Sequence, residues 1–174
     1  MGEVLHLLTD LVDTPIGVLR IVADNEGKLR IALFTENDEP VRRQLRRDYG
    51  KIEFELTPAR NPHGISDTLG RYFAGDLGAI DSIEVQTGGT VFQRKVWQAL
   101  RGISCGTTTS YGRLAQQIGH PTAVRAVGLA NGANPIAVIV PCHRVIGANG
   151  SLTGYGGGIE RKRWLLDHER QLRL

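Results

Sequence analysis

The sequence lacks several features that would define its class at once. It has two cysteines, Cys105 and Cys142, in 174 residues, so we expect neither a disulfide framework nor a four-cysteine zinc site. The longest apolar run, Pro135 to Pro141, is far shorter than the roughly 20 residues of a membrane-spanning helix. The first residues carry no basic segment ahead of an apolar one, as a secretory signal would. We therefore expect a cytoplasmic protein with no membrane partner.

The sequence also lacks a large net charge. The 21 Lys and Arg residues against 18 Asp and Glu give a net charge of +3. This balance is compatible with a polyanionic partner but does not require one. Hydrophobic residues make up 41% of the chain and charged residues 22%, which is typical of a globular protein with one domain or two small ones.

The first half of the chain reads as a sheet with helices. The apolar runs Ile16–Ala23 and Leu29–Phe34 flank a turn-forming segment and predict a β-hairpin. From Pro40 to Tyr49, apolar residues recur every four positions and predict a helix. The four arginines between residues 42 and 47 lie off this stripe, and we interpret them as a solvated face. Ser66 is expected to cap a short helix that ends at Gly75.

The pattern becomes helical after residues 87–90, where two glycines mark a boundary. Phe92 to Ile103 is predicted to be one amphipathic helix. Two shorter helices should follow, Tyr111–Ile118 and Ala123–Gly132, the second capped by Thr122. Two short helices joined by a tight turn with glycine form the outline of a helix-turn-helix.

The second of these short helices is rich in small residues. Gly128 and Gly132 each cost roughly 1 kcal/mol relative to alanine inside a helix, so something should approach this helix closely. Close packing of another helix and insertion into a nucleic-acid groove are both compatible with the sequence.

The segment from Ile136 to Ile146 carries the clearest chemical signal. Its apolar run looks buried and ends at Pro141, directly before Cys142. A reactive cysteine needs surroundings that favour the thiolate, and the adjacent His143 or Arg144 could supply them. Neighbours in sequence need not be in contact, however, because adjacent side chains in an extended chain point in opposite directions.

Taken together, these motifs resemble those of the O6-alkylguanine-DNA alkyltransferase family. The likeness covers residues 90 to 170 and starts from Pro-Cys-His-Arg-Val at 141–145. The other motifs occur in the family's order: Phe92-Gln93, Val96-Trp97, Ser110-Tyr111-Gly112, Arg125-Ala126-Val127-Gly128, Asn134-Pro135, Gly154-Tyr155, Gly157-Gly158, Lys162, Trp164-Leu165-Leu166 and His168-Glu169. Asn61-Pro62 and residues 72–76 are similar to the bacterial constitutive form of the family.

The resemblance implies a role for each matched residue in the chemistry. Cys142 would accept the alkyl group, and His143 would act through water as its base. Glu169 would orient His143, an arrangement that cysteine nucleophiles generally use. Asn134 would be a hinge between the recognition helix and the active-site segment. Cys105 is expected to be structural, and neither a metal nor another cofactor is expected.

The resemblance also implies how the substrate would be held. Tyr111 would donate to guanine N3, the carbonyls of Cys142 and Val145 would accept from the guanine amino group, and Tyr155 and Gly156 would close the pocket over O6. Arg125 would replace the extruded nucleotide in the base stack, because a base flipped out of a duplex leaves a gap. The remaining contacts to DNA would come from Ala123, Ala126 and Gly128.

The fold class expected is α/β. A small N-terminal sheet-plus-helix domain, ribonuclease H-like by resemblance, would span residues 1–87, and a mostly helical C-terminal domain with a winged helix-turn-helix would span residues 88–174. The function implied is irreversible, single-turnover transfer of an alkyl group from O6-alkylguanine, and conceivably O4-alkylthymine, in double-stranded DNA to Cys142. The enzyme would be a methylated-DNA–protein-cysteine S-methyltransferase. It would be a monomer that could also bind DNA cooperatively.

Three other functions fit parts of the sequence. A thiol hydrolase would use Cys142 and His143 but would not explain the helix-turn-helix outline or its glycines. A non-catalytic, damage-sensing alkyltransferase-like protein would lack the acceptor cysteine, which is present here as Cys142. A winged helix-turn-helix regulator would not need the buried Pro-Cys-His-Arg segment. Labelled alkylguanine DNA distinguishes these functions, because the transferase alone moves label permanently to protein.

Overall fold

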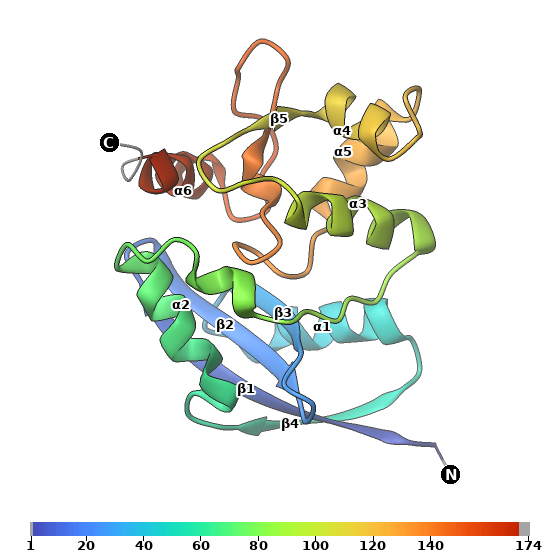
Figure 1. Ribbon diagram of the computed structural model, residues 1–174. Helices are drawn as coiled ribbons and strands as arrows, with labels where there is room; N and C mark the ends of the chain where they lie inside the picture. Colours follow the sequence, from blue (N-terminus) through green and yellow to red (C-terminus); the bar gives the residue numbers. More distant parts are fainter. Residues whose placement is uncertain (1, 171–174) are drawn as a thin grey trace. The chain divides into compact units, whose positions relative to one another are not determined.

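The computed structural model describes residues 2–170. The chain divides into unit 1, Met1–Gly89, and unit 2, Thr90–Leu174, which are coloured blue to green and green to red in Figure 1. The division falls at the glycine pair where the sequence changes from a sheet pattern to a helical one.

Unit 1 is built on a four-stranded sheet. Its strands are β1 (Val4–Thr14), β2 (Gly17–Asp24), β3 (Leu29–Phe34) and β4 (Glu53–Pro58), in the order β3-β2-β1-β4. The β2–β3 hairpin predicted from the sequence is confirmed, and β1 pairs antiparallel with β2. On its other side β1 pairs with β4 in parallel, a connection that requires the chain to cross over the sheet through a helix.

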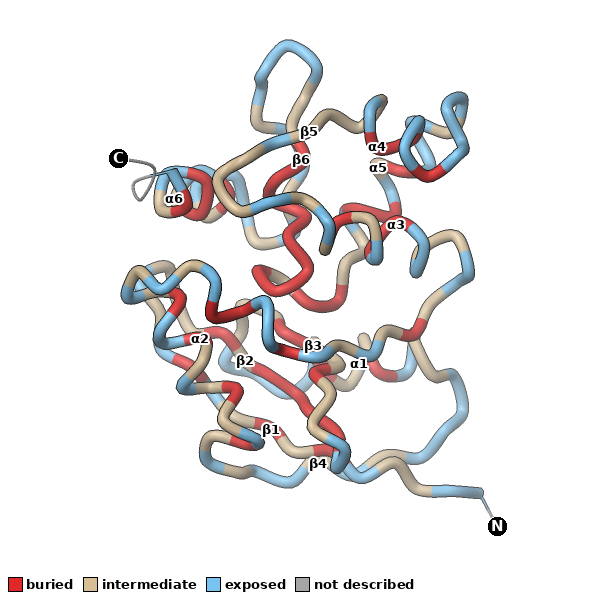
Figure 2. The backbone as a smooth tube through the Cα atoms, viewed as in Figure 1, coloured by how far each residue is buried: buried red, intermediate tan, exposed pale blue. Residues whose placement is uncertain are grey.

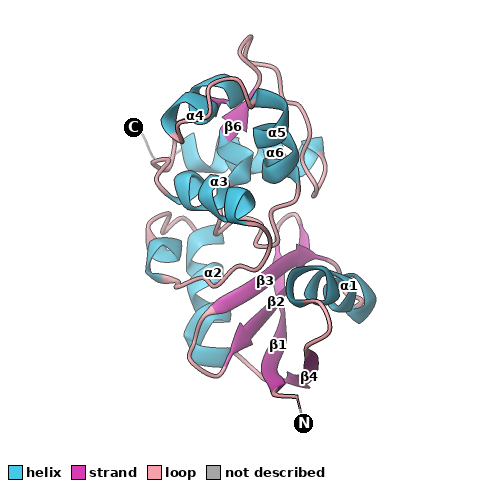
Figure 3. Cartoon of the chain, turned by 90° about the vertical axis from the view of Figure 1, so that its right-hand side faces the viewer, coloured by secondary structure: helices cyan, strands magenta, loops and turns pink. Residues whose placement is uncertain are grey.

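Helices cover both faces of this sheet. Ile21, Val22 and Ala23 are consecutive in β2 and all buried, which requires cover on both faces because successive side chains in a strand point to opposite sides. Helix α1 (Asp38–Tyr49) and helix α2 (Ile65–Phe73) supply it from opposite sides, as Figure 3 shows. The stripe predicted for α1 is confirmed, because its Val41 and Leu45 pack in one core cluster with strand residues.

The predicted start of α2 is wrong. Gly64, with φ of 76°, is the N-cap, and Ser66 lies inside the helix. The Ser66 hydroxyl instead donates a hydrogen bond of 2.6 Å to Asp10 Oδ2 on β1. Ser66 was predicted to cap the helix locally, whereas its hydrogen-bond partner is 56 residues away in the chain. Its hydrogen bond therefore ties α2 to the sheet.

Unit 2 is mostly helical. It contains α3 (Val91–Arg101), α4 (Tyr111–Gln117), α5 (Val124–Gly132) and α6 (Ile159–Arg170), with a short parallel pair of strands, β5 (Thr109–Ser110) and β6 (Val145–Ile146). Thr90 begins α3 with a capping box: its hydroxyl accepts from Gln93 N, and the Gln93 side chain accepts from Thr90 N. The predicted α/β fold class is confirmed.

Helices α4 and α5 form the predicted helix-turn-helix. Ser110 caps α4 by accepting a 3.1 Å hydrogen bond from Arg113 N, and Gly119 supplies the turn with a φ of 80°. The prediction that Thr122 caps α5 is wrong, because Ala123 is the N-cap and no side chain caps the helix. Within residues 2–170, no helix has the length and apolar character needed to cross a bilayer.

Candidate active site

A buried segment inside unit 2 leads the chain to Cys142. Ile136, Val138, Ile139 and Val140 are all buried, as the sequence predicts, and Figure 2 shows the stretch between α5 and β6 mostly in red. Its backbone is not a strand but a pair of three-residue turns. Ile139 N donates to Ala137 O at 2.9 Å, and Cys142 N donates to Val140 O at 2.8 Å.

The first of these turns is strained. Val138 has a φ of 74°, which a β-branched residue rarely adopts. Such conformations cost of order 1–3 kcal/mol and persist where the surrounding structure enforces them. Full burial of Val138 provides that enforcement. Packing around Val138 therefore keeps this turn in its strained conformation, four residues before Cys142.

Asn134 connects this segment to the end of α5. Its Nδ2 donates a 2.7 Å hydrogen bond to Val140 O, and its Oδ1 accepts from Ile136 N at 3.0 Å. One amide therefore holds the buried segment at both ends.

Cys142 is 6% exposed and reaches the surface only slightly. Burial raises the pKa of its thiol, against the opposing effects of hydrogen bonding by Asn134 and of the positive charge on Lys162. The sequence suggested that Arg144 could favour the thiolate, but the Arg144 guanidinium binds Glu169 and the carbonyl of Ile103 instead. The resting cysteine is thus a protonated thiol that needs a base.

A candidate for that base, His143, lies in a buried triad with Glu169 and Arg144. His143 Nε2 is 3.0 Å from Glu169 Oε1, and Arg144 contacts both oxygens of the same carboxylate, Nε at 2.9 Å and Nη2 at 2.8 Å. All three residues are buried. A bidentate contact of this kind fixes the carboxylate plane as well as its charge.

The protonation states follow from these contacts. Burial alone would raise the pKa of Glu169, but hydrogen bonds from Arg144 and His143 outweigh it, and this pKa lies far below its usual range. Burial lowers the pKa of His143, and the favourable effect of Glu169 only partly offsets it. At neutral pH a neutral imidazole therefore faces a carboxylate, which only accepts, so the imidazole donates through Nε2 and carries its lone pair on Nδ1.

His143 Nδ1 is buried and has no hydrogen-bond partner among the described residues. The free lone pair of a neutral imidazole, on the residue next to the cysteine, is positioned to accept a proton. The Tyr155 hydroxyl is likewise buried without a described partner, and burial raises its pKa well above the usual value. Tyr155 is therefore a hydrogen-bond donor and not an anion.

Lys162 is near enough to Cys142 for its positive charge to lower the pKa of the thiol, and no role was predicted for it from the sequence. It is fully buried on α6, and its Nζ donates a 2.8 Å hydrogen bond to Thr153 O. The hydroxyl of Tyr111 donates to the same carbonyl at 3.2 Å. Lys162 could have been recognised from its spacing, because it continues the buried stripe formed by Leu165, Leu166 and Glu169.

Replacing Lys162 by methionine should slow alkylation of Cys142. Methionine fills the same space but removes the positive charge that favours the thiolate. We expect the reaction with iodoacetamide to be roughly 3- to 10-fold slower at pH 7, with its rate-against-pH curve moved to higher pH. Arg163→Met, at the exposed neighbouring position, is the control. A pH curve unchanged in Lys162→Met would show that the ammonium group acts only on the loop that carries Thr153.

Helix α5 has one buried face and one exposed face. Its buried residues are Val127, Ala130 and Asn131, while Arg125 and Ala126 are exposed and Leu129 is 72% exposed. Ala123 and Gly128, predicted with them to contact DNA, are half-buried.

The glycines of α5 have room for a side chain. A Cβ at Gly128 would lie 3.8 Å from the Tyr111 ring, an ordinary contact, and one at Gly132 would meet no described atom within 4 Å. Close packing of another helix therefore does not account for them. This favours the alternative explanation, in which α5 approaches a nucleic-acid groove.

Charge is divided unevenly between the two units. Unit 2 has eleven Lys and Arg residues against three Asp and Glu, whereas unit 1 has ten against fifteen. The excess of positive charge in unit 2 makes it the part better suited to a polyanion.

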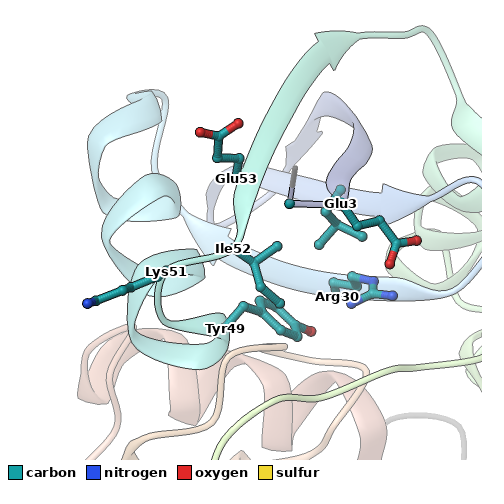
Figure 4. Close-up of a pocket in the computed structure, with 8 residues that line it drawn as sticks. Glu3, Arg30, Tyr49, Lys51, Ile52 and Glu53 are labelled. Carbon is teal, nitrogen blue, oxygen red and sulfur yellow. The ribbon is translucent and has the colours of Figure 1, made fainter.

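A pocket of about 640 Å³ in unit 1 differs in character from the Cys142 site. Its lining combines acids, bases and apolar groups: Glu3, Leu5, Arg30, Tyr49, Lys51, Ile52 and Glu53, with Gly2 (Figure 4). The Arg30 guanidinium lies 5.2 Å from the centre of the Tyr49 ring and pairs with Asp24. With no cysteine in its lining, this pocket has no nucleophile comparable to Cys142.

Comparisons with known proteins show which family this chain resembles. The family model described as "6-O-methylguanine DNA methyltransferase, DNA binding domain" matches residues 91–171. A methylated-DNA–protein-cysteine methyltransferase of Salmonella typhimurium is 52% identical over 170 residues, 98% of this chain and 99% of that protein. One of Mycobacterium tuberculosis is 48% identical over 159 residues, 91% of this chain and 90% of that protein.

Solved structures are similar over nearly the whole chain. The crystal structure of the M. tuberculosis O6-methylguanine methyltransferase aligns with a TM-score of 0.78 and 45% identity, covering 95% of this chain and 93% of that one. The M. tuberculosis protein in complex with DNA aligns over the same shares with a TM-score of 0.76 and 46% identity. The chain therefore belongs to the methylated-DNA–protein-cysteine methyltransferase family.

Proposed function

We propose that this protein repairs alkylated duplex DNA by moving the alkyl group from guanine O6 to Sγ of Cys142, once per molecule. The observation that carries the proposal is the unpaired Nδ1 of His143, whose Nε2 is bound to Glu169, on the residue that follows a buried thiol. A duplex with a labelled O6-methyl group should leave its label on the protein. Label that remains on DNA or enters solution would overturn the proposal.

The proposed reaction is a displacement at the alkyl carbon. The Cys142 proton passes through a water molecule to His143 Nδ1, and Glu169 stabilises the imidazolium that forms. The thiolate then forms the S–C bond while the C–O6 bond breaks, and its electron pair stays on guanine O6. The proton returns from His143 to the base, which becomes unmodified guanine. The thioether on Cys142 is a poor leaving group, so the protein cannot react again.

Groups around the thiol suit the substrate. Tyr155 carries a buried hydroxyl without a described partner, which can donate to O6 as negative charge develops there. The backbone of Gly156 would complete this contact, and the carbonyls of Cys142 and Val145 would accept from the guanine amino group. Tyr111 would exchange its hydrogen bond to Thr153 O for one to guanine N3.

Duplex DNA would meet the exposed face of α5. Phosphate contacts by the basic unit 2 would give affinity without sequence preference, which suits damage that can occur at any site. Small residues at Ala123, Ala126 and Gly128 would let the helix approach the groove, and Arg125 would enter the stack where the base has left. We further propose that one monomer repairs one lesion.

Replacing Arg125 by alanine should impair repair of duplex DNA more than reaction with free O6-benzylguanine. The free base needs no extrusion, which costs a few kcal/mol in a duplex. We expect the duplex rate to fall by roughly 10- to 100-fold and the free-base rate to change by less than about twofold. Arg163→Ala, which removes an exposed charge on α6, controls for the loss of one positive charge. Equal losses on both substrates would place Arg125 in folding or chemistry instead.

A further inference from the structure

A second asparagine on α5 contacts the acceptor residue itself. Asn131 is buried, and its Nδ2 donates a hydrogen bond of 3.4 Å to the carbonyl of Cys142. Three residues later, Asn134 holds Val140 O in the same segment. One amide on α5 and one just beyond its C-terminal end thus bind the segment that carries Cys142. Asn134 already has a proposed role as hinge, and Asn131 has none.

Among the described residues, the Asn131 side chain makes its hydrogen bond through the nitrogen end of the amide alone. Its Oδ1 is buried and has no hydrogen-bond partner among the described residues. A buried acceptor without a donor costs roughly 1–3 kcal/mol, and buried polar groups are nearly always paired in folded proteins. Because Nδ2 is held by the Cys142 carbonyl, Oδ1 is the end of the amide that remains for another molecule.

The chemistry of the substrate limits which donor could reach Oδ1. Alkylation at O6 leaves N1 of guanine without a hydrogen, so the ring nitrogens N1, N3 and N7 all act as acceptors. The exocyclic 2-amino group is the donor that remains on the base edge. This is the group proposed above to lie against the carbonyl of Cys142, which is bonded to Asn131.

We propose that Asn131 is a specificity-determining residue whose Oδ1 accepts a hydrogen bond from the 2-amino group of the extruded O6-alkylguanine. The second N–H of that group would then be shared by the carbonyls of Cys142 and Val145. Nδ2 of Asn131 keeps its hydrogen bond to the Cys142 carbonyl. This inference rests on the proposed function. It gives α5 a part in recognising the base as well as in binding the duplex.

The test removes the two partners separately and together. Single-turnover rates are measured on matched duplexes carrying O6-methylguanine or O6-methylhypoxanthine, which lacks the 2-amino group, with the wild-type protein and with Asn131→Leu. The wild type should prefer the guanine substrate by about tenfold or more. In Asn131→Leu, which has a similar volume and no acceptor, that preference should fall by about fivefold or more. An unchanged preference would overturn the inference.

A second variant separates reading of the base from the structural role of the amide. Asn131→Asp retains an acceptor but loses the donor to Cys142 O, so both rates should fall while the preference stays within about twofold of wild type. Loss of the preference in Asn131→Asp would mean that Oδ1 is not the group that reads the base. Because the readout is a ratio within one protein, partial misfolding of either variant cancels. Absence of transfer from both substrates in the wild type would instead refute the proposed function, and the inference with it.

Discussion

Cys142→Ser is expected to abolish alkyl transfer while leaving the fold and DNA binding intact. Serine occupies nearly the same volume in this buried position, so the packing of the segment should be retained. Its hydroxyl is a far weaker nucleophile than a thiolate, and the site holds a single imidazole base for its activation. We expect the single-turnover rate on O6-methylguanine DNA to fall by at least about 10⁴-fold, measured as label transferred to protein.

Cys105→Ser is the matched control for this prediction. Cys105 is half-buried in the turn after α3 and is the other free cysteine of the chain. Its replacement should leave the transfer rate within about twofold of wild type. Transfer by Cys142→Ser, or loss of transfer in Cys105→Ser, would show that Cys142 is not the acceptor.

Glu169→Gln should have the largest effect on stability. The carboxylate pairs with two buried residues, His143 and Arg144, and glutamine leaves the Arg144 guanidinium buried without its counter-charge. Breaking a buried ion pair from one side costs about 3–5 kcal/mol. The variant should also react roughly 10²-fold more slowly, because His143 loses the carboxylate that orients it and stabilises its protonated form.

The stability effect has a defined dependence on pH. A carboxyl group with a folded-state pKa far below its ordinary value of 4.5 contributes stability that is fully present above about pH 4.5. That contribution is lost as the pH falls toward the folded-state pKa. Denaturant unfolding should therefore show the full difference between wild type and Glu169→Gln at pH 7 and a smaller one at pH 3.

His143 adds a second dependence at higher pH in the wild type. Its folded-state pKa is lowered from 6.5, so stability should begin to fall as the pH drops through about 6.5, where the unfolded state takes up a proton that the folded state does not. Glu160→Gln, at an exposed position in the first turn of the same helix, is the control and should change stability by less than about 0.5 kcal/mol. A Glu169→Gln protein as stable as Glu160→Gln would show that the contacts of Glu169 with His143 and Arg144 do not stabilise the fold.

Elements with strong local signals were predictable from the sequence. The β2–β3 hairpin follows from two apolar runs around a turn, and α1 follows from apolar residues at every fourth position. Strands β1 and β4 were not predicted. Strand β1 forms a tight antiparallel hairpin with β2, in which Thr14 is opposite Gly17, and this local pattern was missed. Strand β4 pairs in parallel with β1, joining Val4 to Glu53 and Leu8 to Thr57, and a parallel pair between such distant segments leaves no local pattern of turn and alternation.

Some residues of the candidate site could likewise be predicted from the sequence, and some of its contacts could not. Cys142, His143 and Glu169 could be named because the sequence resembles a known family, and the structure brings the last two into contact. The contacts of Arg144 with Glu169 and of Lys162 with Thr153 could not, because each joins separate elements through a buried charge. An arginine close to a cysteine in the sequence suggests that its positive charge stabilises the thiolate. In the structure the Arg144 guanidinium pairs instead with the buried carboxylate of Glu169.

Cys142 is proposed to accept one alkyl group per protein molecule. This stoichiometry can be measured by mass spectrometry of the intact protein and its peptides after incubation with a large excess of O6-methylguanine duplex. Every active molecule should gain the mass of one CH₂ group, the gain should lie on the peptide containing Cys142, and the amount of repaired guanine should never exceed the amount of protein. Repeated turnover, or a methyl group found on any other residue, would contradict the proposal.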